Sequence, residues 1–192
     1  MKKVMALCGA AVLAAGIAAC SSSTSSISGS AATAKASASS MSGTETVSGS
    51  VSGSAALANN PSFTLTWRGP VNTTSEFATG GNAPAKGQHH TFKTAAGNLT
   101  VVVSAAPTNT QKLLSASSCR FEVATAIPYK VDGAASTGKF AGATGDGVAT
   151  LTFRADLPKL ANGKCNESNN AQPLAKGAVA RFSIAGPLTV KS

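Results

Sequence analysis

Four cysteines are the side chains whose positions in this sequence most clearly indicate chemistry: Cys8, Cys20, Cys119 and Cys165. Cys20 ends a segment that begins with two lysines and continues as an apolar run over residues 4–19. A basic start, a short apolar stretch and small residues before a cut are the marks of an export signal. The run is shorter than the roughly 20 residues that a membrane-spanning helix needs. We therefore expect the chain to be exported and Cys8 to leave with the signal.

The residues Ile17-Ala18-Ala19-Cys20 resemble the lipobox of bacterial lipoproteins, in which a small residue precedes an invariant cysteine. The resemblance implies that residues 1–19 are a signal peptide, that the thiol of Cys20 receives a diacylglyceryl group, and that the new amino end carries a fatty acid such as palmitate. Two or three acyl chains make a stable anchor. The expected location is the cell membrane, with the domain on the extracytoplasmic side. The alternative is a cleaved secretory signal with an incidental cysteine.

Cys119 and Cys165 lie in the region that is expected to fold. An even pair of cysteines in an exported chain favours a disulfide over a metal site or a reactive thiol. A zinc site would need two further ligands, and no other Cys or His lies within 25 positions of either cysteine. A bridge between them would stabilise the fold by roughly 4 kcal/mol in the chain-entropy model.

The other residues with catalytic potential do not form a recognisable set. His89 and His90 are the only histidines, and neighbours on a strand point to opposite faces, so they cannot share one metal shell. Asp132, Asp146 and Asp156 lie at or beside turns, where Asp is favoured for its backbone hydrogen bonds. Serines abound without the Gly-x-Ser-x-Gly pattern of a nucleophile. We assign no catalytic residue, metal site or cofactor, which favours a protein that is not an enzyme.

Residues 21–60 differ abruptly in composition from the rest of the chain. Of these 40 residues, 31 are Ser, Thr, Ala or Gly, and none is aromatic. Such a segment cannot bury enough apolar surface to offset the entropy lost on ordering. We therefore predict that residues 20–60 form a disordered, flexible tether behind the lipidated Cys20, with an end-to-end distance of about 35 Å.

Residues 61–192 have the usual size of a single domain with one core. Their apolar residues recur with a period of two, as in Phe63, Leu65 and Trp67. This alternation is typical of strands with one buried face, and only residues 110–115 hint at a helical turn. We predict an all-β, antiparallel barrel of about eight strands. The alternative is a two-sheet β-sandwich, which the period does not exclude.

The predicted domain carries 13 basic and six acidic residues, a net charge of +7. The basic residues are dispersed singly, with no run, no helical stripe and no aromatic platform among them. This dispersal argues against nucleic-acid binding. The charge serves solubility and could also favour an anionic envelope polymer as partner.

Four glycines, Gly138, Gly142, Gly145 and Gly147, lie between strands that are predicted near residues 129–131 and 148–154. A phosphate-binding loop would need a helix after the glycines, whereas here a strand follows. We therefore expect a tight glycine-rich hairpin in which the glycines supply positive φ angles and close backbone approach.

The run Gly-Lys-Phe-Ala-Gly-Ala-Thr-Gly at residues 138–145, with residues 163–166 and 186–189, resembles small exported β-proteins of actinobacteria, whose function is unassigned. It is more distantly similar to the glycine-rich hairpin of allene oxide cyclase and dirigent barrels. The resemblance implies an eight-stranded barrel. It implies no activity, because no catalytic set of those barrels can be placed here residue by residue.

Two classes of function follow from these patterns. The first is a membrane-anchored envelope lipoprotein whose barrel is a non-enzymatic binding or structural module, for an apolar small molecule, a lipid or an envelope partner. Small barrels can hold one ligand, and this chain is rich in Ala, Gly and Val. The second is a cyclase or isomerase, by analogy of fold alone. A carboxylate with a polar partner inside the barrel would favour the enzyme.

Overall fold

The computed structural model describes residues 39–79, 84–168 and 171–191. The predicted signal peptide at residues 1–19, the lipidation site Cys20 and residues 21–38 of the predicted tether lie outside the described residues. In the described part the chain forms strands and two short 3-10 helices, and none of its helices has the length and hydropathy needed to cross a bilayer.

The described residues form nine strands: β1 (Ser40–Ser52), β2 (Ser62–Arg68), β3 (Thr73–Ala78), β4 (His89–Thr94), β5 (Gly97–Val103), β6 (Thr108–Ser115), β7 (Arg120–Val131), β8 (Thr144–Asp156) and β9 (Leu174–Lys191). The 3-10 helix η1 (Gly53–Leu57) follows β1, and η2 (Gly138–Phe140) lies between β7 and β8.

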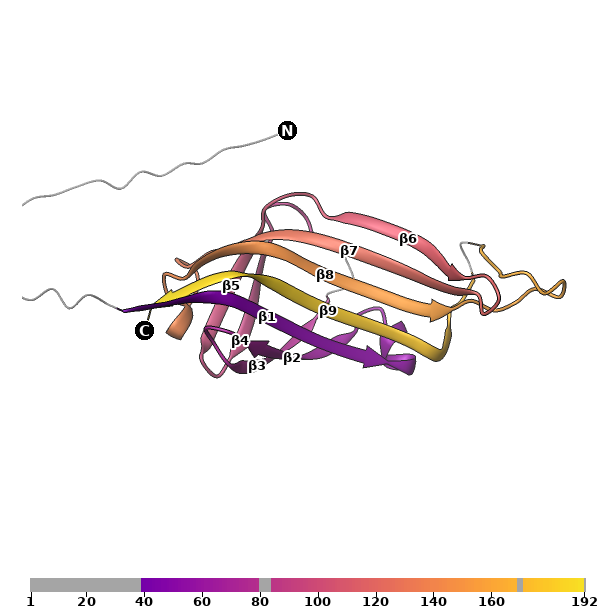
Figure 1. The fold of residues 1–192 in the computed structure, drawn as a ribbon, viewed down its shortest axis with the longest axis horizontal. Coiled ribbons are helices and arrows are strands. Elements are labelled where there is room, and N and C mark those ends of the chain that lie inside the picture. The colour runs from indigo at the N-terminus through magenta and orange to yellow at the C-terminus, as the bar shows by residue number, and fades with distance from the viewer. Residues whose placement is uncertain (1–38, 80–83, 169–170, 192) are drawn as a thin grey trace, which may run out of the picture. The chain divides into compact units, whose positions relative to one another are not determined.

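One antiparallel sheet contains all nine of these strands, in the order β5-β4-β3-β2-β1-β9-β8-β7-β6. The sheet closes because the last part of β7 also pairs with β5, through Val101 with Val131, Val102 with Lys130 and Val103 with Tyr129. The first part of β7 pairs instead with β6. The result is a closed barrel of eight strands with β6 as one extra strand outside the closure (Figure 1). The predicted barrel is confirmed, and the alternative of a two-sheet sandwich is wrong.

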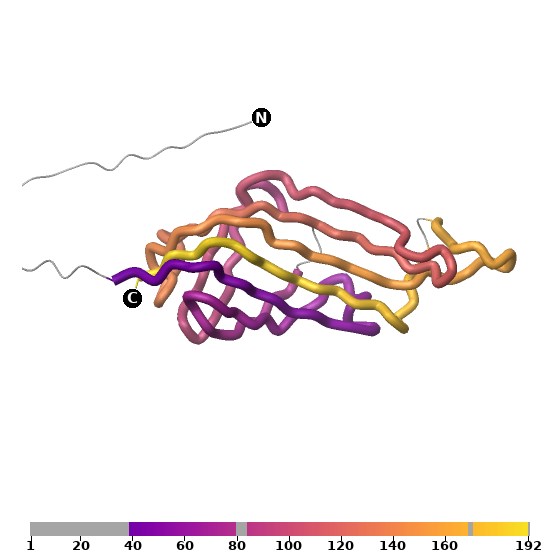
Figure 2. The backbone as a smooth tube through the Cα atoms, in the orientation of Figure 1, coloured from indigo at the N-terminus to yellow at the C-terminus, as the bar shows by residue number. Residues whose placement is uncertain are grey.

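The predicted tether is wrong over residues 40–57, because these residues form β1 and η1. All 13 residues of β1 pair with β9, from Ser40 opposite Lys191 to Ser52 opposite Val179, and Figure 2 shows the two strands side by side. Glu45 and Val47 are buried, while their neighbours along the strand are exposed. The small polar residues of β1 cover its outer face, so a composition typical of disorder is compatible with a barrel strand. The folded domain therefore begins near Ser40, not at residue 61.

Two smaller expectations also differ from the structure. Residues 110–115, where the sequence hints at a helical turn, belong to β6 and pair with β7. A Gly-Pro pair usually marks a turn or loop between elements, whereas Gly186-Pro187 lies within β9. There Pro187 pairs with Thr44 of β1, and β9 shows that a proline can occupy a long barrel strand where no ladder bond from its nitrogen is required.

The glycine-rich segment is divided between a turn and a strand. Gly138 and Gly142 have φ angles of 62° and 69°, which confirms their expected role in a tight connection. Gly145 and Gly147 lie in β8 and not in the hairpin loop as predicted, because β8 begins at Thr144. A Cβ atom on Gly145 would lie 2.2 Å from the carbonyl oxygen of Pro187, so this glycine permits close approach of β8 to β9.

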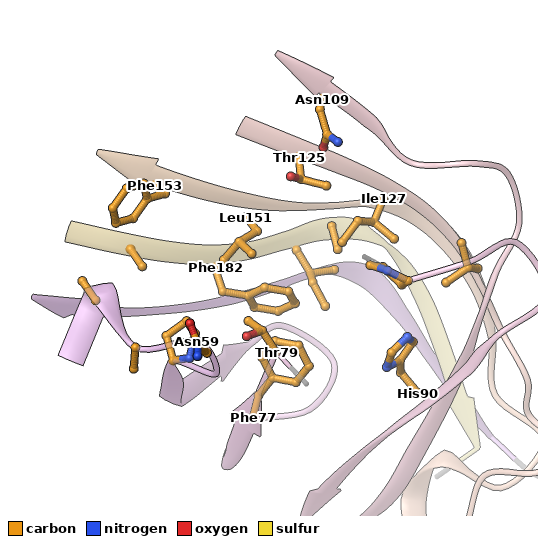
Figure 3. A pocket seen from close by; sticks show the side chains of 18 of the residues that line it. Asn59, Phe77, Thr79, His90, Asn109, Thr125, Ile127, Leu151, Phe153 and Phe182 are labelled. Carbon is orange, nitrogen blue, oxygen red and sulfur yellow. The ribbon is translucent and has the colours of Figure 1, made fainter. Parts of the chain in front are cut away.

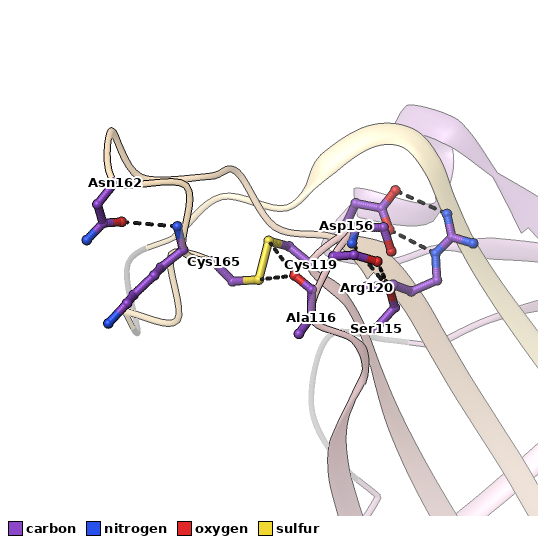
Figure 4. The surroundings of a disulfide bond; sticks show 10 residues. Ser115, Ala116, Cys119, Arg120, Asp156, Asn162 and Cys165 are labelled. Atoms are coloured by element: carbon purple, nitrogen blue, oxygen red, sulfur yellow. Dashed lines mark hydrogen bonds and ion pairs between the residues drawn. A yellow bond between two sulfur atoms is a disulfide. The ribbon is translucent and has the colours of Figure 1, made fainter.

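The predicted disulfide is present, and joins Cys119, just before β7, to Cys165 in the connection between β8 and β9 (Figure 4). Cys119 has a φ of 57°, the only positive value among the described residues other than glycine. An isolated bridge between Lys159 and Cys165 orders the same connection. The disulfide therefore holds residues 157–168 against the end of the sheet where β7 starts and β8 ends.

A buried carboxyl group supports the turn between β2 and β3. Glu45 of β1 is 4% exposed, and its Oε2 accepts a hydrogen bond of 3.0 Å from the backbone N–H of Val71. Its Oε1 is buried and has no hydrogen-bond partner among the described residues. Burial raises the pKa of this carboxyl, and backbone hydrogen bonds from Val71 and Arg68 lower it by less. The folded state thus binds the proton of Glu45 more tightly than the unfolded chain does, and burying the charged form costs stability.

We predict that Glu45→Gln raises the melting temperature at pH 7. The amide oxygen of Gln can accept from Val71, and no charge is buried. Because the pKa of Glu45 is higher in the fold than its ordinary value of 4.5, its contribution to stability is full below that value and is lost as the pH rises. The gain should therefore shrink toward zero near pH 4 in thermal melts followed by circular dichroism.

The matched control is Glu76→Gln, since Glu76 is exposed and accepts a hydrogen bond from Thr64. This control should leave the pH dependence of the melting temperature unchanged. A Glu45→Gln gain that is equally large at pH 4 and pH 7 would contradict the assignment of a charge penalty to Glu45.

We also predict that the folded, unreduced domain has no free thiol and that reduction lowers its melting temperature by more than about 5 °C. The basis is a loss of about 2–4 kcal/mol at roughly 3–6 °C per kcal/mol for a domain of this size. The measurements are alkylation with mass spectrometry and thermal melts with and without reductant. Quantitative alkylation of Cys119 and Cys165 in the native protein would contradict the bridge.

Candidate functional site

The barrel is hollow, and its interior contains a cavity of about 500 Å³ (Figure 3). The wall is formed by alternate residues of the strands, for example Thr125, Ile127 and Tyr129 of β7. Because side chains alternate between the two faces of a strand, the same residues that gave the sequence its period of two point inward here. The alternating residues that predicted the strands are therefore also the residues that line the cavity.

Apolar side chains make up most of the wall. Three rings, those of Phe77, Phe92 and Phe182, contact one another from β3, β4 and β9. The ring centroids of Phe77 and Phe182 are 4.5 Å apart and those of Phe77 and Phe92 are 5.5 Å apart. The remaining apolar residues of the wall are Ala56, Leu57, Ala58, Pro61, Pro84, Val101, Val103, Ile127, Ala149, Leu151, Phe153, Pro173, Ala180 and Ile184. Such a wall suits an apolar ligand.

The end of the barrel near η2 is filled. Phe140 of η2 is fully buried and packs against Trp67, with ring centroids 5.9 Å apart. The indole N–H of Trp67 donates a hydrogen bond of 2.9 Å to the hydroxyl of Ser75, which satisfies the one polar atom of that ring. Leu188 and Val190 are buried in the same core cluster. Neither Trp67 nor Phe140 belongs to the cavity wall, so the cavity ends before it reaches these packed side chains.

The cavity opens toward the opposite end of the barrel. Ala56, Phe92 and Ala180 are among its buried lining residues, whereas Asn59 and Gln172 are exposed. Asn109 at the start of β6 and Ala58 after η1 are exposed lining residues as well. We call the exposed lining residues Ala58, Asn59, Asn109 and Gln172 the mouth. It lies where β7 no longer pairs with β5 and the sheet continues with β6.

The two histidines are on opposite faces of β4, as the sequence predicts. His90 lines the cavity (Figure 3), whereas His89 is 56% exposed, with its Nδ1 3.4 Å from a carboxylate oxygen of Asp132. Burial lowers the pKa of His90, so its ring is neutral at pH 7. Its Nε2 is buried without a hydrogen-bond partner among the described residues. His90 therefore contributes a neutral polar ring to an apolar wall.

Tyr129 is the second polar ring of the wall, and it depends on two glycines. A Cβ atom on Gly147 or Gly186 would lie 2.8 Å or 2.9 Å from the hydroxyl oxygen of Tyr129. Burial, followed by the charges of Asp146 and Glu45, raises the pKa of Tyr129 to about 12. The hydroxyl consequently stays protonated. Gly147 thus leaves room for the side chain of Tyr129. The sequence pattern did not reveal this role, since it indicates only backbone geometry.

The wall of the cavity contains no acidic or basic side chain among the residues that the structure describes, apart from the neutral His90. Within the same residues, no three His, Cys, Asp or Glu side chains gather where they could hold a metal ion. Its polar side chains are Asn59, Thr79, Asn109, Thr125, Tyr129 and Gln172, in addition to His90. The arrangement can exclude water and donate or accept hydrogen bonds, and it offers no carboxylate for proton transfer.

The carboxylates near the mouth are engaged in ion pairs on the outer face of the sheet. Glu122 of β7 pairs with Lys112 at 2.9 Å and with Arg154, and these two partners, Lys112 first, lower its pKa. Arg120 pairs with Asp156 through two hydrogen bonds of 2.8 and 3.1 Å (Figure 4). Outward-pointing residues of the strands provide these pairs, so they stand outside the cavity.

The residues that were predicted as sites do not converge on the cavity. Cys119 and Cys165 hold the connection that contributes Gln172 to the mouth and Pro173 to the wall. Of the four glycines, only Gly147 acts next to the wall, through Tyr129. The mouth residues Asn59 and Asn109 carry no signal in the sequence, because each comes from a turn or strand end that resembles any other.

The chain was compared with family models, with curated proteins and with solved structures. No family model, no curated protein and no solved structure matches it. The function is accordingly argued from the cavity and its mouth.

Proposed function

We propose that this protein is a membrane-anchored envelope lipoprotein whose barrel binds an apolar small molecule or lipid without transforming it. The observation that carries the proposal is the cavity of about 500 Å³, lined mainly by aromatic and aliphatic side chains and open at one end. Ligand-binding pockets range from about 300 to 1,000 Å³ and are mostly apolar with a few polar groups. This cavity lies within that range and has that composition.

The architecture supports a pre-formed site. Most wall residues come from strands of one hydrogen-bonded sheet, which holds their side chains without a ligand. The pairing is thinnest between β3 and β4, where only Ser75 and Thr94 pair. Apolar cavities of even about 150 Å³ stay dry and take up apolar molecules. A larger one that opens to solvent exposes apolar surface, which an apolar ligand would cover. His90 and Tyr129 offer hydrogen bonds to a ligand with one polar group.

The absence of a carboxylate from the described wall favours binding over a cyclase or isomerase activity. General acid–base catalysis needs a group whose pKa lies near the working pH and within hydrogen-bond reach of the substrate. The pKa of Tyr129 is far above 7, and the pKa of His90 is lowered by burial. Among the described residues, neither ring forms a hydrogen bond or an ion pair with a second group that could transfer a proton.

The proposed anchor rests on the segment before the described residues. Lys2, Lys3, the apolar run at residues 4–19 and Cys20 support export and lipidation of the cysteine. A disulfide in the folded domain agrees with an oxidising compartment outside the cytoplasm. The sequence before Ser21 and the disulfide of the described domain together support an extracytoplasmic binding module on a lipid anchor.

The binding proposal predicts that the protein takes up an uncharged apolar dye, N-phenyl-1-naphthylamine, with a rise in its fluorescence. Ala180→Phe should weaken dye binding by about tenfold or more, because Ala180 is a buried wall residue of β9 and a ring there would fill the cavity. The measurement is a fluorescence titration of both proteins.

The matched control is Ala185→Phe, which makes the same change at an exposed position of the same strand. Circular dichroism melts check that both variants fold. Absence of dye binding by the unmodified protein, or equal binding by the Ala180→Phe variant, would contradict a ligand site inside the barrel.

The anchoring proposal predicts that the protein made in a bacterium incorporates labelled palmitate and partitions into detergent. Cys20→Ala should abolish that labelling and leave an unprocessed form, because the thiol that receives the lipid is gone. The measurement is metabolic labelling followed by detergent phase separation. Cys119→Ala serves as a control that removes a different cysteine, and undiminished labelling after Cys20→Ala would rule out the lipoprotein assignment.

A further inference from the structure

The connection between β8 and β9 projects beyond the ends of the strands (Figure 2). Its tip is an ordered turn, in which the N–H of Leu160 donates to the carbonyl of Lys164 at 2.7 Å and the N–H of Gly163 donates to the carbonyl of Leu160 at 2.9 Å. The disulfide from Cys165 to Cys119 ties the base of this turn to the sheet. We call residues 159–165 the projecting turn. It is a rigid feature with a defined direction.

Exposed leucines gather at the end of the barrel that carries the projecting turn. Four of the six exposed large apolar side chains of the described residues lie there: Leu113, Leu114, Leu160 and Leu174. The pairings place them together, since Leu113 lies opposite Phe121 and Leu174 opposite Asp156 at the same ends of β7 and β8. The other two, Met41 and Val148, lie toward the opposite end. The leucines therefore border the end at which the cavity opens.

The same end is cationic. Lys159 and Lys164 flank Leu160 in the projecting turn, and all three are exposed. The ends of β6 to β9 and residues 157–168 together carry seven lysines and arginines and three acidic residues. Glu122 and Asp156 form ion pairs with three of these cations, Lys112, Arg154 and Arg120. The excess positive charge is carried by Lys159, Lys164, Lys176 and Arg181. A leucine between two lysines on a projecting turn suits a membrane interface, where the apolar tip enters and the lysine heads stay at the anionic surface.

We propose that the mouth end of the barrel docks on the surface of an anionic lipid bilayer, with Leu160 of the projecting turn inserted among the lipids. The inference goes beyond the proposed ligand site, and the docking itself does not require that site to be filled. It would place the mouth next to a source of lipid. A bilayer fits better than a protein partner, because Leu160 lies at the tip of a projecting turn between Lys159 and Lys164, and such a single apolar tip with flanking cations suits insertion into an anionic membrane surface.

The connection to the anchor permits this orientation. β1 starts at the filled end of the barrel and has 13 residues, a length of about 43 Å. Residues 21–39 lie between Cys20 and β1 and span at most about 65 Å when fully extended. The chain after Cys20 is therefore long enough for the mouth end to reach the membrane in which the cysteine is anchored.

The test uses the mature chain of residues 21–192 without its lipid, in flotation with vesicles of phosphatidylglycerol and phosphatidylcholine in equal parts. The protein should float with these vesicles, and less so with pure phosphatidylcholine or at high salt. Leu160→Ser should reduce the bound fraction by about tenfold. The matched control is Val148→Ser, because Val148 and Leu160 are both 46% exposed and Val148 lies near the other end.

A second measurement keeps the test independent of folding. Leu160→Trp should shift its fluorescence to shorter wavelength when the anionic vesicles are added, whereas Val148→Trp should not. Ala180→Phe, which fills the cavity, should float as the unmodified protein does, so docking and ligand binding can fail separately. Failure of the protein to float, or equal losses from Leu160→Ser and Val148→Ser, would overturn the docking proposal.

Discussion

The pairing of β5 with the last three residues of β7 is the constraint on which the rest of the structure depends. It joins the two halves of the sheet at one end only. Beyond that point β7 pairs with β6, which has no second neighbour among the described strands. The barrel is therefore closed and filled near η2 and open at the other end. The cavity and its mouth both follow from a closure that covers part of one strand.

The interior shows how small residues and large rings divide the space. Alanines at positions 149 and 180 face the cavity on β8 and β9, while Phe77, Phe92 and Phe182 line it from β3, β4 and β9. Where the wall needs a polar ring, glycines make room, as Gly147 and Gly186 do for Tyr129. A barrel with larger residues at these positions would have a filled core. The small side chains of these alanines and glycines thus leave the space that forms the cavity.

The fold could be predicted from the sequence wherever strands are amphipathic. Phe63, Leu65 and Trp67 alternate with polar residues, and β2 is present as predicted. β1 was not predicted, because its inward residues, Glu45 and Val47 among them, include few large apolar side chains. The Ser- and Thr-rich composition of the segment therefore indicated disorder more strongly than its alternation indicated a strand.

The disulfide could also be predicted, since two cysteines in the expected domain of a chain that was expected to be exported favour a bridge, and the bridge is present. The cavity could not. Whether a barrel is hollow depends on the packing of side chains from strands far apart in the sequence, as the contact of Phe77 with Phe182 illustrates. No local pattern around either phenylalanine distinguishes a wall residue from a core residue.

The pairing of the first described strand with the last has a consequence for how the protein is made. β1 lies beside β9 along all 13 of its residues, so its partner is synthesised only after all the strands that lie between them in the sequence. Until β9 arrives, β1 has one unpaired edge, and the contacts that complete the barrel span almost the whole domain. Folding with such distant contacts is slow, and an unpaired edge invites association with other chains. The polar, serine-rich outer face of β1 protects the chain during that interval, because a strand with few exposed apolar residues is a poor template for aggregation.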